Sequence, residues 1–143
     1  MIIPNYPTCF VCGHENNRGL NMTFESEGNT ITSQFTPEPN LCSYTGVLHG
    51  GIIASILDEG MGWTGYPSTE KYFFTAELTV RYKKPVSTDR TYTLKAELIS
   101  MRKRLYVAKG SITDAEGTVY ATGEGKYMLL NEPDKDKISK DTK

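Results

Sequence analysis

The sequence has few of the side chains on which many enzymes depend: its 143 residues include two histidines, His14 and His49, and three cysteines. Any chemistry that needs an imidazole must use one of these two residues. Lys and Arg number 16 against 17 Asp and Glu, and the net charge of −1 gives no electrostatic reason to expect a nucleic-acid partner. No apolar run approaches the roughly 20 residues of a membrane span, and no basic leader precedes a hydrophobic stretch. We therefore expect no membrane association and a cytoplasmic location.

The three cysteines, Cys9, Cys12 and Cys42, are odd in number, which argues against a disulfide framework and for a reducing compartment. Cys9 and Cys12 form a Cys-x-x-Cys pair that is followed by His14. Two thiolates at this spacing can grip one tetrahedral zinc ion, so a zinc site on Cys9, Cys12 and His14 is one hypothesis. The alternatives are a redox pair and two small apolar residues in a tight turn. We expect no other cofactor.

Composition predicts a single globular domain over residues 1–130, because 38% hydrophobic and 23% charged residues are ordinary for such a domain. Residues 131–143 carry eight charged groups and one aliphatic side chain. A segment of this kind buries too little to offset its ordering entropy, so we expect a disordered tail.

Hydrophobic periodicity predicts one helix over residues 51–64. Its apolar face is formed at spacings of three and four by Ile52, Ile53, Ile56, Leu57 and Met61. The other face carries small residues and a single carboxylate, that of Asp58, so a strand, a second subunit or a ligand could approach it closely.

Alternating apolar residues predict that most of the remaining chain is antiparallel sheet. The pattern indicates a hairpin over 20–36 and strands over 73–84, 91–100, 105–113 and 118–130. In the strand over 73–84, one face is expected to carry Phe74, Ala76, Leu78, Val80 and Tyr82. One helix and one sheet can bury each other only if the sheet curves around the helix, which predicts an α+β fold.

The segment HGGIIASILDEGMGW contains the residues best suited to chemistry. His49 and two glycines stand at the helix mouth, where free N–H groups and the helix dipole can hold an oxyanion. Asp58 lies two turns further along among apolar neighbours, so its pKa is expected to rise toward that of a useful base or nucleophile. This pairing suits hydrolysis of an activated acyl group. The alternative is a locally bonded histidine, a glycine cap and a solvated acidic patch.

These residues resemble the hotdog-fold thioesterases, specifically the phenylacetate-type (PaaI-like) branch. The segment CFVCGHENNRGLNMTF resembles the opening of one subgroup, and TAELTVRYKKPV resembles the strand that follows the helix; together the matches span roughly residues 9 to 130. The resemblance implies a hotdog fold, in which a curved antiparallel sheet of five to six strands wraps one long central helix. It also implies a homodimer, often paired into a homotetramer, with active sites at the subunit interface.

The resemblance further implies an acyl-CoA thioesterase. Asp58 matches the carboxylate that acts as nucleophile or general base, and Gly50, or less closely Gly51, matches the residue whose backbone amide polarises the thioester carbonyl. His49 matches the residue that supports this turn. Thr75 matches a position that helps to hold the attacking water, although it can also be an ordinary strand threonine.

Two substitutions depart from the family pattern before the histidine. Ser43 and Cys42 stand where relatives often have Asn or Gln, and either replaces an amide only partly. A thiol there also allows a nucleophilic cysteine, but no second histidine is available as its base.

The substrate would need an acyl chamber and a site for the coenzyme A phosphates. The chamber is expected to involve Trp63, Met61, Tyr66 and Phe74, although Trp63 can also be core. Candidates for the phosphates are Arg102, Lys103 and Arg104, and the basic run over 81–84, which can equally be solvated. An alternative function is a non-catalytic acyl-CoA-binding or regulatory protein on the same fold. A hotdog hydratase or dehydratase is another.

Overall fold

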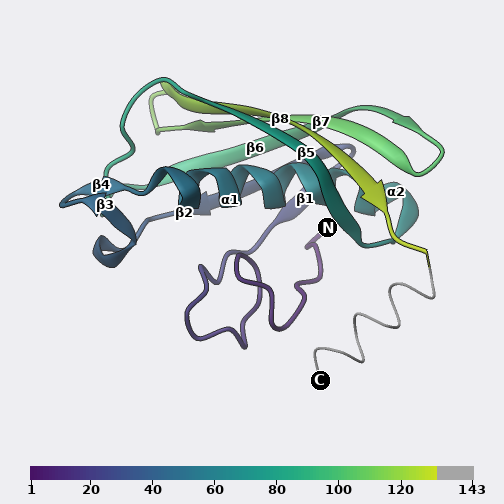
Figure 1. The fold of residues 1–143 in the computed structure, drawn as a ribbon, viewed down its shortest axis with the longest axis horizontal. Helices are drawn as coiled ribbons and strands as arrows, with labels where there is room; N and C mark the ends of the chain where they lie inside the picture. The colour runs from purple at the N-terminus through teal and green to yellow at the C-terminus, as the bar shows by residue number, and fades with distance from the viewer. Residues whose placement is uncertain (132–143) are drawn as a thin grey trace.

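The structure, a computed structural model, describes residues 1–131 and contains one antiparallel sheet of six strands (Figure 1). Its strand order is β1-β2-β6-β7-β8-β5. The strands are β1 (Glu25–Glu27), β2 (Thr30–Phe35), β5 (Phe73–Tyr82), β6 (Tyr92–Arg102), β7 (Leu105–Thr113) and β8 (Val119–Leu129). Strands β6, β7 and β8 form a meander. Strand β5, which precedes them in the chain, pairs with the outer edge of β8. The edge position of β5 leaves one of its sides unpaired within the described residues.

One long helix, α1 (Gly50–Gly62), lies along the concave side of this sheet (Figure 1). It is preceded by η1 (Pro39–Leu41) and a two-stranded ribbon of β3 (Cys42–Tyr44) and β4 (Val47–Leu48), and followed by η2 (Trp63–Gly65) and α2 (Tyr66–Thr69). The predicted α+β hotdog fold, with a central helix wrapped by a curved sheet, is confirmed. The helix begins one residue earlier than predicted and continues past Gly62 as a 3-10 turn.

The helix and the sheet approach each other closely where the strands carry glycine. A Cβ at Gly110 would lie 3.1 Å from Met61, and one at Gly123 would lie 3.0 Å from the same side chain. Leu57 and Met61 are fully buried against these positions. Burying an apolar side chain of this size stabilises the fold by about 1.5–3 kcal/mol. Glycine at these two strand positions therefore makes room for the helix.

The first arm of the predicted hairpin is shorter than expected. Strand β1 covers only Glu25–Glu27, and the turn to β2 passes through Gly28 at a positive φ of 62°. Upstream, the Met22 amide donates to the Val11 carbonyl at 2.9 Å, so this stretch pairs with the N-terminal segment instead of β2. The N-terminal segment lies across the helix on the side away from β7 and β8 (Figure 1).

A bulge in β5 corrects the predicted face of that strand. Thr75 pairs with Tyr127 and Glu77 pairs with Lys126, which leaves Ala76 as the extra residue. The alternation of side chains therefore changes at Ala76. Leu78 and Val80 are partly buried, as predicted, but Phe74 is 50% exposed and Tyr82 is 52% exposed. Before the bulge, Phe73 and Thr75 face the helix.

Among the described residues, no helix is long and apolar enough to cross a membrane. The tail predicted over 131–143 falls outside the described residues from position 132 onward.

Candidate active site

The entry to α1 leaves one backbone amide available. His49 is the N-cap, and its Nδ1 accepts a hydrogen bond from the Gly51 amide at 2.9 Å. The next two amides, of Ile52 and Ile53, donate to the His49 carbonyl. Within residues 1–131, the Gly50 amide donates to no acceptor. The helix dipole adds positive potential here, so the Gly50 N–H is the donor best placed for a developing negative charge.

Strand β5 lies along the small-residue face of α1 and contacts it at three levels. The Tyr82 hydroxyl donates to the Gly50 carbonyl at 2.7 Å, and Thr75 contacts Asp58. At the far end, a Cβ at Gly62 would lie 2.1 Å from the Phe73 ring. A strand was one of the partners predicted to approach this face of the helix closely, and that strand is β5.

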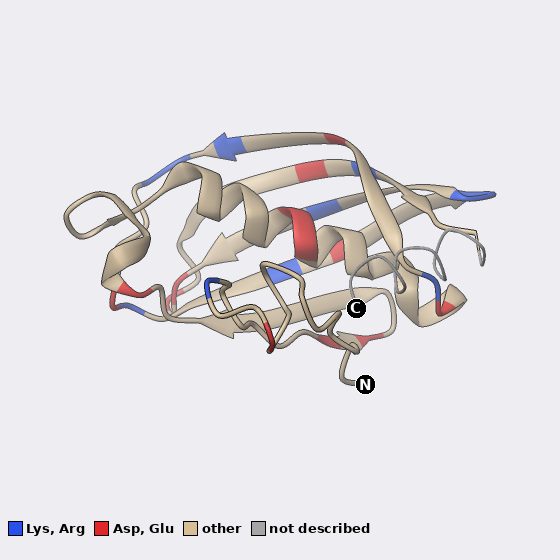
Figure 2. Cartoon of the chain, turned by 60° about the horizontal axis from the view of Figure 1, so that its bottom comes forward, with Lys and Arg blue, Asp and Glu red and all other residues tan. Residues whose placement is uncertain are grey.

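Asp58 is a half-buried carboxylate held by two hydroxyl groups. Its Oδ1 accepts from Thr75 Oγ1 at 2.8 Å and from the Tyr127 hydroxyl at 3.1 Å. Burial raises the pKa of Asp58, and the two hydrogen bonds partly oppose that rise. Asp58 and Glu59 are the only charged residues of α1 (Figure 2). The structure therefore brings Thr75, a residue singled out by the family resemblance, to Asp58, and it excludes a fully solvated Asp58.

Tyr127 is a site residue that the sequence interpretation missed. It lies on the inward-facing parity of β8, where burial and the charge of Asp58 raise its pKa. The sequence contains a signal for this contact. A tyrosine on the inward-facing side of a strand needs a polar partner for its hydroxyl group, and the helix has few polar side chains. Tyr106 stacks on Tyr127 with 5.5 Å between ring centroids and donates to the Gly62 carbonyl.

The Gly50 amide and the Asp58 carboxylate lie far apart within one chain. Eight residues at 1.5 Å per residue separate them by about 12 Å along the helix. The structure therefore does not bring the Gly50 amide and the Asp58 carboxylate together within one chain.

The residues predicted to line an acyl chamber lie in different parts of the structure. Trp63 lines a pocket beside Phe73 and makes an edge contact with Tyr66 at 5.4 Å between centroids. Met61 packs between helix and sheet, and Phe74 lies on the opposite face of β5 from Thr75. The bulge at Ala76 explains the exposure of Phe74. In this chain Phe73 occupies the inward position.

The basic and polar candidates lie toward both ends of the helix. Arg102 ends β6, and Lys103 and Arg104 form the turn to β7; all three are exposed, and register places them toward the Phe73 end of β5. The run over 81–84 instead surrounds Tyr82, which contacts Gly50. Ser43 is exposed on β3, ahead of His49, and is not brought to Asp58. Cys42 pairs with Leu48 in the same ribbon.

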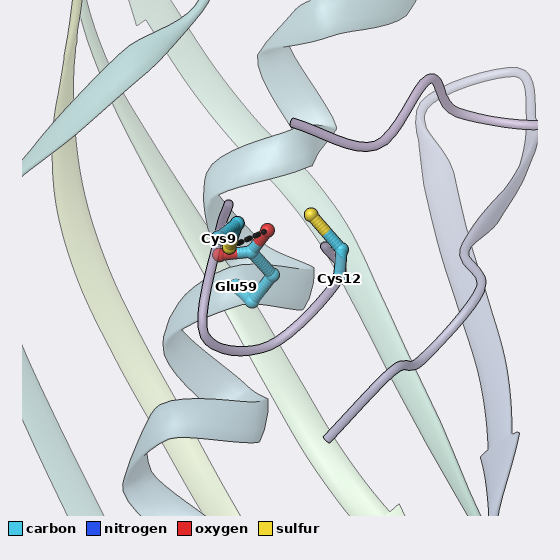
Figure 3. A group of neighbouring side chains, drawn as sticks. All are labelled: Cys9, Cys12 and Glu59. Carbon is cyan, nitrogen blue, oxygen red and sulfur yellow. Dashed lines mark hydrogen bonds between the residues drawn. The ribbon is translucent and has the colours of Figure 1, made fainter. Parts of the chain in front are cut away.

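A second polar cluster lies on another side of α1. Cys9 Sγ, Cys12 Sγ and a carboxylate oxygen of Glu59 all lie within 4.8 Å of one another (Figure 3). Cys9 Sγ is 3.4 Å from Glu59 Oε2, and the Trp63 indole N–H donates to the same oxygen at 2.7 Å. His14 is not in this group, because its side chain is exposed and pairs with Asn21. The set of Cys9, Cys12 and His14, one of the hypotheses from the sequence, is therefore not brought together; Glu59 lies beside the two thiols in place of His14.

The three groups of this cluster perturb one another. Hydrogen bonding with Cys12 lowers the pKa of Cys9 to about 5, and the same interaction, aided by burial, raises the pKa of Cys12. Burial and the neighbouring charge of Cys9 raise the pKa of Glu59 to about 7. The cluster concentrates acidic groups in a partly dry environment.

The chain matches the family model described as "Thioesterase superfamily" over residues 45–121. This range includes α1, β5, β6, β7 and the start of β8, and therefore contains Gly50, Asp58 and Thr75.

Known proteins resemble the chain at modest identity. It is 32% identical over 98 residues to acyl-coenzyme A thioesterase THEM5 of Mus musculus, covering 67% of this chain and 39% of that protein. The chain spans between 39% and 54% of the length of the curated relatives it matches. The crystal structure of the thioesterase superfamily protein RHA08564 is 28% identical, with a TM-score of 0.75 over 82% of this chain and 61% of that chain.

The E. coli PaaI protein from the phenylacetic acid degradation operon shares the fold. It is 17% identical, with a TM-score of 0.73 over 82% of this chain and 88% of that chain.

Replacing Tyr127 by Phe is expected to raise the pKa of Asp58 further, because the carboxylate loses a hydrogen bond that stabilises its charged form. A pH titration of the Asp58 carboxyl carbon by NMR measures this directly. Tyr120→Phe is the matched control, since the Tyr120 hydroxyl bonds Asp114 instead. An Asp58 pKa that is unchanged or lowered in Tyr127→Phe would contradict the assigned contact.

Proposed function

The chain belongs to the thioesterase superfamily, and on that premise we propose that it hydrolyses the thioester of an acyl-coenzyme A. The observation that carries this proposal is the desolvated Asp58 carboxylate, held by Thr75 and Tyr127. Similarity to THEM5, which is named as an acyl-coenzyme A thioesterase, supports the choice of substrate class. The reaction adds water across the acyl–sulfur bond and gives a carboxylic acid and a free thiol.

Asp58 acts in its charged form by one of two routes. It either attacks the carbonyl carbon, or it removes a proton from the water that attacks. Partial burial raises its basicity, while Thr75 and Tyr127 keep the carboxylate oriented. Because a base must be unprotonated, activity is expected to increase with pH through the Asp58 pKa.

The Gly50 amide stabilises the negative charge that develops on the carbonyl oxygen. His49 Nδ1 engages the Gly51 amide and thereby fixes the turn, while the Gly50 N–H is left to the substrate. One hydrogen-bond donor aimed at the developing oxyanion contributes about 10²–10³-fold to the rate of acyl transfer. Arg81, Lys83 and Lys84, near this helix end, supply positive charge for the coenzyme A phosphates.

The complete site contains residues from two subunits. Since about 12 Å separates Gly50 from Asp58 along one helix, the amide and the carboxylate that act on one thioester come from different copies of the chain. A two-fold dimer supplies both combinations at once. The unpaired side of β5, with Phe74 and Tyr82 exposed near its two ends, offers a surface for this association.

Replacing Asp58 by Asn is expected to lower kcat for thiol release by at least about 10²-fold. The amide oxygen can still accept from Thr75 and Tyr127, so the fold should survive. The folded-state pKa of Asp58 exceeds its unfolded value, so its charge destabilises the fold above that pKa; the variant should be no less stable at neutral pH.

The assay follows thiol release from short, medium, long-chain and aromatic acyl-CoAs, with circular dichroism as the check on folding. Glu77→Gln is the control, because Glu77 is an exposed acid on the same strand as Thr75. Full turnover by Asp58→Asn would exclude the mechanism. Tight acyl-CoA binding by the unaltered protein without thiol release would instead favour a non-catalytic binding role.

Replacing Gly50 by Pro is expected to reduce kcat about 10²-fold, because proline removes the one free amide. The helix should tolerate the change: Gly50 is its first residue, and His49 is already extended at ψ 134°. Gly50→Ala is the control, since it keeps the N–H and its Cβ would lie 3.6 Å from Tyr82, an ordinary contact. Equal activity of the Pro and Ala variants would exclude the Gly50 amide.

Co-expression of the Asp58→Asn and Gly50→Pro chains is expected to restore about a quarter of normal activity. Random pairing makes half of the dimers mixed, and each mixed dimer has one unaltered site if the two groups act across the interface. Asp58→Asn with Thr75→Val is the control and should stay inactive, because both residues belong to the same half-site. Absence of recovery in mixed dimers would mean that the site lies within one chain.

A further inference from the structure

The Cys9, Cys12 and Glu59 cluster already approaches the geometry of a metal site. Around tetrahedral zinc, two sulfur ligands lie about 3.8 Å apart and a sulfur and an oxygen about 3.5 Å apart, given the usual metal–ligand lengths. Cys9 Sγ and Glu59 Oε2 are 3.4 Å apart, and all three ligand atoms lie within 4.8 Å of one another. Small side-chain movements would therefore complete the geometry.

The loop that carries the cysteines is shaped to present two sulfurs to one point. The Gly13 amide donates to the Cys9 carbonyl at 2.9 Å, which closes a tight turn. A Cβ at Gly13 would lie 2.5 Å from the Cys9 backbone nitrogen, so only glycine allows this closure. The neighbouring backbone amides of Val11 and Cys12 help to lower the pKa of Cys9, as suits a thiolate.

Glu59 is directed toward this loop by the helix and by Trp63. The indole N–H of Trp63 holds Glu59 Oε2 at 2.7 Å, and the carboxylate faces the loop of Cys9 and Cys12 (Figure 3). The ion pairs within residues 1–131 are Arg90–Asp114 and Lys126–Glu77, and neither includes Glu59. A carboxylate removed from water next to two thiols lacks a compensating positive charge, which a cation would supply.

We propose that Cys9, Cys12 and Glu59 bind one zinc ion that fastens the N-terminal segment to α1. The softness of two thiolates selects zinc over magnesium or calcium, and the mixed sulfur and oxygen set is within the range that zinc accepts. The pocket that opens beside Cys9 and Glu59 leaves room for water as the fourth ligand. The site is independent of the chemistry proposed at Asp58, because Glu59 faces the loop of Cys9 and Cys12, whereas Asp58 faces β5 and β8.

The first experiment needs no variant. The full chain, purified under reducing conditions and stripped of metal, is titrated with Co²⁺ and separately with Zn²⁺. We expect one ion per chain, a thiolate-to-cobalt charge-transfer band in the near ultraviolet, and its loss when zinc is added. Zinc at about 100 times its Kd should raise Tm by roughly 5–10 °C.

Single variants then identify the ligands by metal content and by the cobalt band. Cys9→Ser and Cys12→Ser should each abolish stoichiometric binding, and Glu59→Gln should weaken it at least about 10-fold. The matched controls are Cys42→Ser, which removes the cysteine outside the cluster, and His14→Ala, which removes the exposed histidine. Both controls should bind one ion as the unaltered protein does.

Two results would overturn the proposal. One is a reduced protein that titrates as three free thiols and shows neither a cobalt band nor a zinc-dependent change in Tm. The other is binding that survives Cys9→Ser and Cys12→Ser but is lost in a control, which would place the ion elsewhere. A Cys9–Cys12 disulfide in protein that binds no zinc after reduction would favour the redox interpretation instead.

Discussion

The constraint on which this structure depends is that its central helix carries two adjacent carboxylates. Helix α1 packs between the sheet and the N-terminal segment, and Asp58 and Glu59 lie in its middle. Consecutive helical residues point about 100° apart, so the two acids meet different neighbours. Asp58 meets hydroxyl groups of β5 and β8, and Glu59 meets the cysteine loop. Each acid is therefore paired with polar side chains from a different part of the chain.

Local pattern was sufficient to predict the framework of the fold and the position of Asp58 on the helix, whereas Thr75 entered only through the family resemblance. The apolar spacing of α1 and the alternation of β6 and β7 are properties of short segments, so a sequence reveals them. The register of β5 is not local. One extra residue at Ala76 turns Thr75 toward the helix and Phe74 away, and only pairing with β8 determines where that residue is accommodated. Tyr127 reaches Asp58 through the same pairing.

Sequence patterns did not identify Glu59 as the third member of the cysteine cluster, for a related reason. His14 is two positions from Cys12, and nearness along the chain made it the natural candidate. The turn closed by Gly13 directs both sulfurs toward α1, whereas His14 remains at the surface beside Asn21. Glu59 reaches them from 47 residues beyond Cys12 because the N-terminal segment crosses the helix at that level. A contact between segments so far apart follows from packing alone.

The length of α1 explains why a domain with so few reactive side chains can still hold a complete site. In this chain the free amide stands at the helix start, and the half-buried carboxylate stands further along, where β5 and β8 shield it from water. These positions separate Gly50 from Asp58 by about 12 Å in any single chain. Under the proposed two-fold arrangement, the amide of one copy and the carboxylate of the other act on the same thioester, so the separation within one chain does not prevent catalysis. Strand β5 contacts both Gly50 and Asp58, so its unpaired side is the surface across which the two halves would meet.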